Sequence, residues 1–167
     1  MIFTGKGKGK TSAAIGTCLR SIAESKTVYL IQFLKSGNSG EVKCLKNFKA
    51  KFKYKSFGKN SFTKPDKLTK KDFDIARKGV KESLKAIDEV PFLLVLDEIL
   101  ITLEFGLTKE RDIIRIVNKC NENQVHLILT GRGANENLIE LADLVTEMKC
   151  IKHPFDKDHE AIKGIDY

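Results

Sequence analysis

Apolar and polar residues follow two different patterns, which alternate along the chain. Continuous apolar runs rich in β-branched residues predict strands buried on both faces of a parallel sheet. These runs occupy residues 27–33 and 92–98, and further strands are predicted at residues 2–4, 125–130 and 143–148. Between them, apolar residues recur at spacings of three and four, as on one side of an amphipathic helix. The alternation predicts an α/β fold, with a mainly parallel sheet and helices on both faces, in one domain over residues 1–167.

Local signals set the ends of several predicted helices. Thr69 and Asp72 form a capping-box pattern before a long amphipathic helix that ends near Asp88. Asn135 is placed to cap a short helix. The remaining helices are predicted over residues 9–23 and 41–47, and around the apolar positions Ile113, Ile116, Val117 and Cys120.

Residues 48–57 have a period of two. Aromatic and small residues, among them Phe52 and Tyr54, alternate strictly with lysines. This pattern predicts a half-buried strand whose lysines guard a sheet edge against pairing with another chain. A binding stripe of lysines is the alternative.

Composition limits the class of protein. The 167 residues, 41% of them hydrophobic, suffice for one core. No apolar run approaches the ~20 residues of a membrane span, and a glycine-rich motif begins almost at Met1 in place of a signal peptide. We therefore expect a cytoplasmic protein that is not bound to a membrane. Its four cysteines show no C-x-x-C spacing and are expected to be buried, reduced thiols.

A net charge of +8 raises the question of nucleic-acid binding. Much of the lysine excess lies between Lys43 and Lys71. Aromatic residues make up only 8% of the chain, and those at residues 48–57 face away from the lysines, which is a poor stacking platform. A solvated lysine surface is the preferred interpretation, and no nucleic-acid partner is predicted.

A glycine-rich turn joins the first predicted strand to the first predicted helix. Residues 5–11 read G-K-G-K-G-K-T. Glycines let successive backbone N–H groups face one anion, and a helix N-terminus adds partial positive charge there. The common phosphate-loop pattern G-x-x-x-x-G-K-[ST] is shortened here by one residue, so that it begins at Gly5. The turn predicts a nucleoside triphosphate site, because a chance glycine- and lysine-rich turn would not need the flanking strand and helix.

Each side chain of this loop has a predicted task. Lys10 is placed to reach the phosphates, and the Thr11 hydroxyl to ligate Mg²⁺ or Mn²⁺. Lys6 and Lys8 add positive charge at the same end. The predicted nucleotide-binding residues are Gly5, Lys6, Gly7, Lys8, Gly9, Lys10, Thr11 and Ser12.

Polar residues follow two later strands at the end of the sheet where ligands of α/β proteins bind. Asp97 and Glu98 end one strand, and with Thr11 they are the predicted metal ligands, one carboxylate binding directly and the other through water or by orienting a neighbour. A carboxylate pair that only complements a helix dipole is the alternative. Arg132 follows the next strand, either to neutralise triphosphate charge or as a structural arginine. Lys10, Glu98 and Arg132 are the predicted catalytic residues.

The three histidines give no catalytic assignment. His126 lies inside an apolar strand and is expected to be in the core. His153 precedes Pro154 and stays a candidate, whereas His159 has no informative context.

Eight motifs in order along the chain resemble the P-loop ATP:corrinoid adenosyltransferases of cobalamin synthesis and corrinoid salvage. They are T-G-K-G-K-G-K-T (4–11), Q-F-L-K (32–35), G-E (40–41), L-D-E (96–98), L-T-G-R (129–132), A-D-L-V-T-E-M (142–148), K-H-P-F (152–155) and G-I-D (164–166). The resemblance covers essentially the whole chain. The shortened loop and the A-D-L-V-T-E-M segment are far more specific than a generic phosphate loop.

The resemblance implies a RecA-like homodimer that binds ATP with Mg²⁺ in a reversed orientation. A cobalt(I) corrinoid takes the 5′-deoxyadenosyl group, and inorganic triphosphate leaves. A reduced flavoprotein is the candidate electron donor.

Three local departures from the family pattern are visible. The family usually has an N-terminal extension, whereas Met1 lies only three residues before Thr4. Residues 23–25 replace a glycine-rich turn, a change expected to be harmless. Residues 58–64 carry Lys64 where the family often has a tryptophan, and there Phe62 is predicted either to bind the corrin or to pack onto the core.

Two other functions remain as alternatives at this point. One is a P-loop nucleoside kinase, although no acceptor-binding segment or catalytic base stands out. The other is a RecA-like nucleic-acid-binding ATPase, motivated by the lysines.

Overall fold

In the computed structural model, residues 1–37, 39–59, 65–152 and 162–165 are described. Their strands form one six-stranded sheet in the order β3-β2-β4-β5-β1-β6, in which every neighbouring pair is parallel. The strands are β1 (Ile2–Thr4), β2 (Val28–Phe33), β3 (Phe52–Phe57), β4 (Leu93–Asp97), β5 (His126–Thr130) and β6 (Val145–Glu147). The prediction of a mainly parallel sheet is confirmed.

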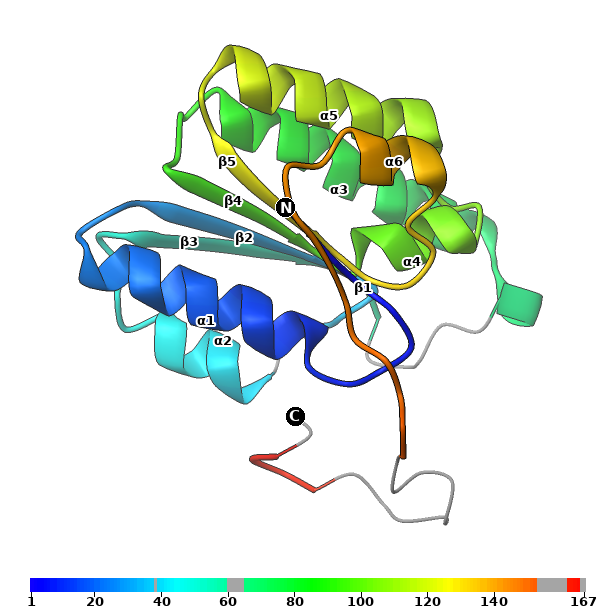
Figure 1. Cartoon of the computed structure of the whole chain (residues 1–167), viewed down its shortest axis with the longest axis horizontal. Helices are drawn as coiled ribbons and strands as arrows, with labels where there is room; N and C mark the ends of the chain where they lie inside the picture. Colours follow the sequence, from blue (N-terminus) through cyan, green and yellow to red (C-terminus); the bar gives the residue numbers. More distant parts are fainter. Residues whose placement is uncertain (38, 60–64, 153–161, 166–167) are drawn as a thin grey trace.

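Helices cover both faces of this sheet, as Figure 1 shows. Helices α1 and α2 lie on one face, and α3, α4, α5 and α6 lie on the other. Their bounds are α1 (Lys10–Ala23), α2 (Gly40–Leu45), α3 (Lys70–Ile87), α4 (Ile99–Glu104), α5 (Glu110–Glu122) and α6 (Glu136–Glu140), with a 3₁₀ turn η1 (Pro65–Lys67) before α3. The α/β architecture with helices on both faces is therefore confirmed.

Two apolar clusters hold these layers together. Ile31, Leu94 and Leu96 point to the α3–α5 side, whereas Leu30 and Val95 point to the α1–α2 side. All five residues are fully buried, as expected for the central strands of a parallel sheet. Capping also follows the sequence: Thr69 and Asp72 form the predicted capping box of α3.

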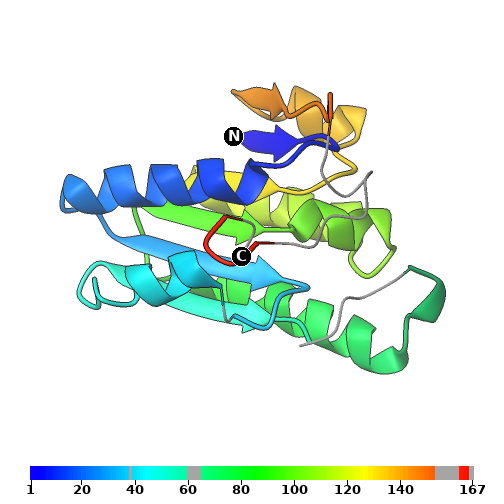
Figure 2. The same cartoon turned by 90° about the horizontal axis from the view of Figure 1, so that it is seen from below.

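The carboxyl ends of the strands meet along one edge of the sheet, at the same side in Figure 2. Strand β5 separates β1, which leads into the glycine-rich loop, from β4, which ends in Asp97. This order and the loop at the start of α1 are those of a RecA-like P-loop domain. The residues that follow β1, β2, β4 and β5 are thereby brought together.

Several local predictions are wrong. Strand β3 begins at Phe52, because Phe52 and Lys51 donate backbone hydrogen bonds to the Phe48 carbonyl and close a turn. His126 is exposed, since it is the first residue of β5, at the amino end of this internal strand, where its ring meets Phe92 edge-on. Helix α4 was not predicted.

The cysteine prediction is half right. Cys18 and Cys120 are buried free thiols, but Cys44 and Cys150 are exposed. Burial raises the pKa of each buried thiol to about 12. Within the described ranges, no helix is both long and apolar enough to cross a bilayer.

Candidate nucleotide and metal site

The glycine-rich loop ends where α1 begins. Gly9 is the N-cap with φ 113°, and the Ala13 N–H donates to its carbonyl, so that the preceding amides of the helix start have no partner within the helix. Lys10 is 8% exposed, and its Nζ donates to the carbonyls of Gly5 (2.8 Å) and Gly7 (2.7 Å). Burial lowers the pKa of Lys10, with the nearby Glu98 charge opposing that shift. The loop thus places the Lys10 ammonium group next to the N-terminus of α1.

The last part of the sheet supports this loop from behind. The Met148 N–H donates to the Thr4 carbonyl (2.8 Å), and the Gly7 N–H donates to the Met148 carbonyl (2.6 Å). A Cβ on Gly5 would lie 2.5 Å from the Met148 carbonyl oxygen, and one on Gly7 would lie 2.7 Å from that of Lys149. Two of the loop glycines are therefore required by the close approach of β6 and the residues after it.

Asp97 at the end of β4 is fully buried and accepts four hydrogen bonds. Its Oδ1 accepts from the hydroxyls of Thr11 (2.9 Å) and Thr130 (2.7 Å). Its Oδ2 accepts from Nε2 of Gln32 (2.9 Å) and Nζ of Lys35 (2.7 Å). Burial alone would raise the pKa of Asp97, but the charge and hydrogen bond of Lys35 and the two hydroxyl donors outweigh it and hold the pKa below its usual value. Asp97 is therefore an anion that is hydrogen-bonded to the end of β2, the end of β5 and the start of α1.

Glu98, the next residue, has a strained backbone and a partly buried side chain. Its φ of 64° is left-handed, a conformation that costs a side-chain-bearing residue about 1–3 kcal/mol and is often kept at functional sites. Its N–H donates to Oγ1 of Thr130 (2.9 Å). Its Oε2 is buried with no hydrogen-bond partner among the described residues. Burial and the charge of Asp97 raise the pKa of Glu98.

Two cavities meet over this cluster and share Lys10, Lys35 and Glu98. The larger, of about 660 Å³, runs along the start of α1 and is closed in part by Gly164 and Ile165. The smaller, of about 300 Å³, runs toward α4 and has apolar walls from Leu34, Ile101 and Phe105. The arrangement can therefore accept two ligands on either side of one charged centre.

The other residues predicted from the sequence lie around these cavities or outside the described residues. Lys8 and Ser12 line the larger cavity, and Nζ of Lys8 donates to the Ile165 carbonyl (2.9 Å). Lys6 is exposed on the loop. Arg132 is exposed and lines the smaller cavity with Lys10 and Glu98. Phe62 and His153 lie outside the described residues.

Sequence reasoning assigned a role to Thr11 but not to the other residues that hold Asp97. They are Gln32, Lys35 and Thr130, together with Tyr54, whose hydroxyl donates to Oε1 of Gln32 (2.9 Å). The sequence signal for this network was Gln32, a polar residue in an otherwise apolar run. Such a residue needs a hydrogen-bond partner when it is buried.

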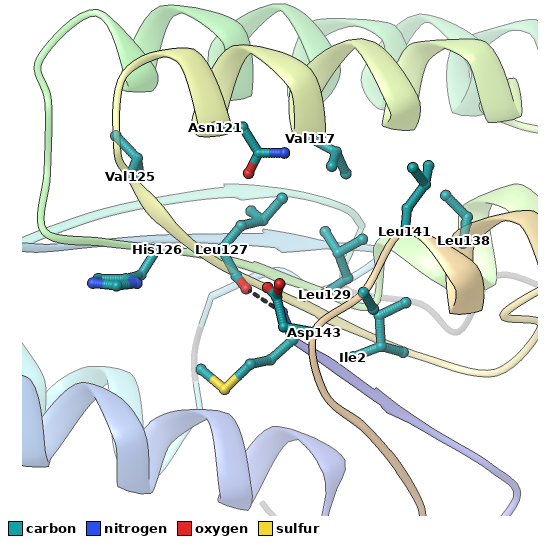
Figure 3. A pocket seen from close by; sticks show the side chains of 12 residues that line it. Ile2, Val117, Asn121, Val125, His126, Leu127, Leu129, Leu138, Leu141 and Asp143 are labelled. Atoms are coloured by element: carbon teal, nitrogen blue, oxygen red, sulfur yellow. Dashed lines mark hydrogen bonds between the residues drawn. The ribbon is translucent and has the colours of Figure 1, made fainter.

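A separate cavity, with both apolar and polar residues in its lining, lies at the amino ends of β1 and β5, under α5 (Figure 3). It holds only about 130 Å³ and is lined by side chains such as Val117, Leu129 and Leu138. The Met1 nitrogen donates to the Leu127 carbonyl (2.8 Å) at its base. None of the residues predicted to bind nucleotide or metal lines this cavity, so the chemistry is assigned to the opposite end of the sheet.

The sheet order, the loop that opens α1 and the acidic pair at the end of β4 define a P-loop domain. Comparison with known proteins makes the class specific. The model of the family described as ATP:corrinoid adenosyltransferase BtuR/CobO/CobP matches residues 1–167. This chain belongs to that family.

Curated relatives agree with the family match. A corrinoid adenosyltransferase of Sinorhizobium sp is 35% identical over 170 residues, covering 100% of this chain and 79% of the relative. The corrinoid adenosyltransferase CobA of Salmonella typhimurium is 34% identical over 170 residues, and the corrinoid adenosyltransferase of Escherichia coli K12 is 31% identical over 169. Both alignments cover 100% of this chain and 84% of the relative.

Proposed function

We propose that this protein transfers the 5′-deoxyadenosyl group of ATP to the cobalt(I) centre of a corrinoid and releases inorganic triphosphate. The observation that carries the proposal is the match of residues 1–167 to the ATP:corrinoid adenosyltransferase family. The geometry supports it, because Lys10, Asp97 and Glu98 converge beneath two cavities, as a reaction between two substrates requires.

In the proposed reaction the cobalt(I) electron pair attacks C5′ of ATP. A cobalt–carbon bond forms, the bond between C5′ and the α-phosphate oxygen breaks, and the electron pair of that bond leaves with the triphosphate. Cobalt(I) is already a strong nucleophile, so the protein needs no nucleophilic side chain of its own. Its task is to position the two substrates and to stabilise the leaving anion.

Positive charge at the glycine-rich loop suits a triphosphate leaving group. Lys10 lies in the mouth of the loop, and Lys8 lines the larger cavity. The amides at the start of α1 and the exposed Lys6 add to the positive potential there. Arg132, on the wall of the smaller cavity, is proposed to contribute its charge from the other side.

The oxygen atoms of Thr11, Asp97 and Glu98 fit a Mg²⁺ ion, because hard oxygen ligands are what this ion prefers. The buried Oε2 of Glu98, which has no partner among the described residues, is an acceptor suited to such a cation. We propose that Thr11 and Glu98 hold the ion and that Asp97 orients Thr11 through their 2.9 Å hydrogen bond. Mg²⁺ bound there would neutralise phosphate charge.

The family resemblance supplies the finer parts of the proposal. It implies that ATP is bound in a reversed orientation, with C5′ toward the corrinoid, that Phe62 contacts the corrin and that the protein acts as a homodimer. It also makes a reduced flavoprotein the proposed electron donor. Neither a nucleoside kinase nor a nucleic-acid-binding ATPase is favoured, because the family match covers the whole chain.

Product analysis separates these functions. Protein, ATP, Mg²⁺ and a chemically reduced corrinoid should yield a light-sensitive cobalt–carbon product and intact inorganic triphosphate, detected by optical spectra and ³¹P NMR. A kinase or ATPase would instead release ADP by transfer of the γ-phosphate. Formation of ADP with no triphosphate and no change in the corrinoid spectrum would contradict the proposal.

A further inference from the structure

The ammonium group of Lys35 lies among the oxygen atoms proposed to bind magnesium. Its Nζ donates to Oδ2 of Asp97 (2.7 Å) and to Oγ1 of Thr11 (2.9 Å), and it lies 4.0 Å from Oε1 of Glu98. The Thr11 hydroxyl gives its proton to Asp97 and accepts from Lys35. The side-chain oxygen that would face a metal ion is therefore already bonded to a cation of the protein itself.

The backbone holds Lys35 in this place. Leu34 adopts a left-handed φ of 57°, and its N–H donates to the Phe57 carbonyl (2.9 Å). A Cβ on Gly58 would lie 2.2 Å from the backbone nitrogen of Lys35, so the chain after β3 packs directly against the turn that carries Lys35. A left-handed leucine is costly and persists only where the surrounding structure imposes it. The position of Lys35 is thus built into the ends of β2 and β3.

The positive charge of Lys35 faces the negative charges of Asp97 and Glu98. Burial would lower the pKa of Lys35, but the carboxylates of Asp97 and Glu98 outweigh it and raise the pKa, so the side chain stays an ammonium. Asp97 is fully buried, and a buried charge without a partner is strongly destabilising. Lys35 therefore supplies the ion-pair partner of the buried Asp97 and adds to the positive charge that Lys10 places near Glu98.

We propose that Lys35 is an internal counter-ion, which occupies the cation position of the metal-free site and is displaced when magnesium binds. This inference rests on the proposed magnesium site. The larger cavity gives the displaced side chain a destination, since Lys35 and Glu41 both line it. Lys35 is thus a positioning residue. It keeps Asp97 and Thr11 ordered without metal, and its departure links metal binding to the arrival of negative charge in the cavity.

Removal of the competing charge tests this role directly. Lys35→Met keeps the length of the side chain and removes its charge, so Mn²⁺ binding measured by EPR without nucleotide should tighten. A nearby charge changes the affinity of an ionisable site for a proton by roughly 10- to 10³-fold, and we expect the affinity for Mn²⁺ to rise within that range. Lys55→Met is the matched control, because Lys55 pairs with Glu82 on α3, away from the site. Its Mn²⁺ affinity should equal that of the wild type.

A measurement on the wild-type protein covers the case in which Lys35→Met does not fold. An ammonium held by Asp97 and Thr11 should give a resolved ¹⁵N lysine NMR signal, assigned by its loss in Lys35→Arg. This signal should disappear or shift when Mg²⁺ and ATP are added together. An unchanged signal, or equal Mn²⁺ affinity of Lys35→Met and wild type, would overturn the role of Lys35 alone. Absence of Mn²⁺ binding even with ATP would overturn the magnesium site and this inference together.

Discussion

Thr130, at the end of β5, donates a 2.7 Å hydrogen bond to Oδ1 of Asp97, at the end of the neighbouring β4. The same hydroxyl oxygen accepts the backbone N–H of Glu98 (2.9 Å). One side chain therefore orients the first carboxylate and fixes the strained backbone of the second.

Thr130→Val should disturb the site while keeping the shape of the side chain. Loss of a group that orients a ligand typically costs about 10- to 100-fold in metal affinity or activity, and we expect a loss of adenosylation rate in this range. Circular dichroism should show a retained fold. Thr108→Val is the matched control, since Thr108 is a buried threonine whose hydroxyl is bonded to Thr102 and not to either carboxylate. Equal loss of activity in both variants would show that the effect is only structural.

Lys10→Ala should reduce adenosylation by ~10²–10³-fold, because it removes the cation that the loop holds for the leaving triphosphate. The measurement is the initial rate with saturating corrinoid over a range of ATP concentrations. Lys53→Ala removes an exposed lysine paired with Glu89 and should have little effect. Wild-type turnover in Lys10→Ala would contradict the assignment of the whole site.

Glu98→Gln should raise the concentration of Mg²⁺ needed for half-maximal activity, because an amide is a weaker ligand than a carboxylate. Thr11→Ala should act in the same direction. Each variant is titrated with Mg²⁺ at a fixed ATP concentration. Glu122→Gln, at the exposed end of α5, serves as the control and should keep the wild-type requirement. An unchanged metal requirement in both site variants would remove Thr11 and Glu98 from the metal site.

Phe62→Ala should slow adenosylation without changing the affinity for ATP. Phe62 is an apolar residue in a polar stretch, and the predicted contact with the corrin should favour loss of the lower axial ligand, which makes cobalt(II) easier to reduce. Cobalt(II) spectra recorded with and without protein measure this effect. If the spectrum is unchanged on binding to both wild type and variant, Phe62 does not contact the corrin in this way.

Asp72 should make stability depend on pH at the start of α3. Its hydrogen bonds with Lys59 and Thr69 lower the pKa of Asp72 to about 2 from an ordinary 3.8. A carboxylate whose pKa is lowered by folding stabilises the folded state at pH values above its pKa in the unfolded chain. This stabilisation is lost as the pH falls from 3.8 toward 2. Asp72→Asn should therefore lower the free energy of unfolding by about 1–2 kcal/mol near pH 7 and by much less near pH 2.

Thermal unfolding over a range of pH checks the effect at Asp72. Asp74→Asn is the matched control on the same helix, since the Asp74 side chain is about half exposed and, among the described residues, forms an ion pair only with Arg77, in an i,i+3 contact. Such an exposed pair contributes little. A constant stability difference between Asp72→Asn and wild type at all pH values would contradict the assignment.

The buried strands could be predicted because side chains on both of their faces are apolar, which is typical of strands in the middle of a parallel sheet. The phosphate loop and the carboxylates after β4 could be predicted because they follow strands in sequence. Helix α4 could not, because Ile99–Glu104 is a short, nearly continuous apolar run, and its N-cap Glu98 makes no side-chain capping hydrogen bond. Periodicity cannot divide such a run into strand and helix.

The partners of Asp97 could not be predicted for a different reason. Contact of Gln32 and Lys35 with Asp97 depends on β2 lying next to β4, although α2, β3 and α3 separate them in the sequence. Local patterns do not determine this order of strands. His126 shows the same limit, because its apolar neighbours predict a strand but not where the sheet ends.

The hydrogen bond between Gly7 and Met148 has a consequence for the biosynthesis of the protein. It joins segments near opposite ends of the described chain, and contacts of such long sequence separation form late. A ribosome has to release the chain through Glu147 before β6 can pair with β1 and brace the loop. Acquisition of nucleotide affinity during translation therefore reports the closing of the entire sheet, and a chain arrested before β6 emerges would still lack the support for its loop.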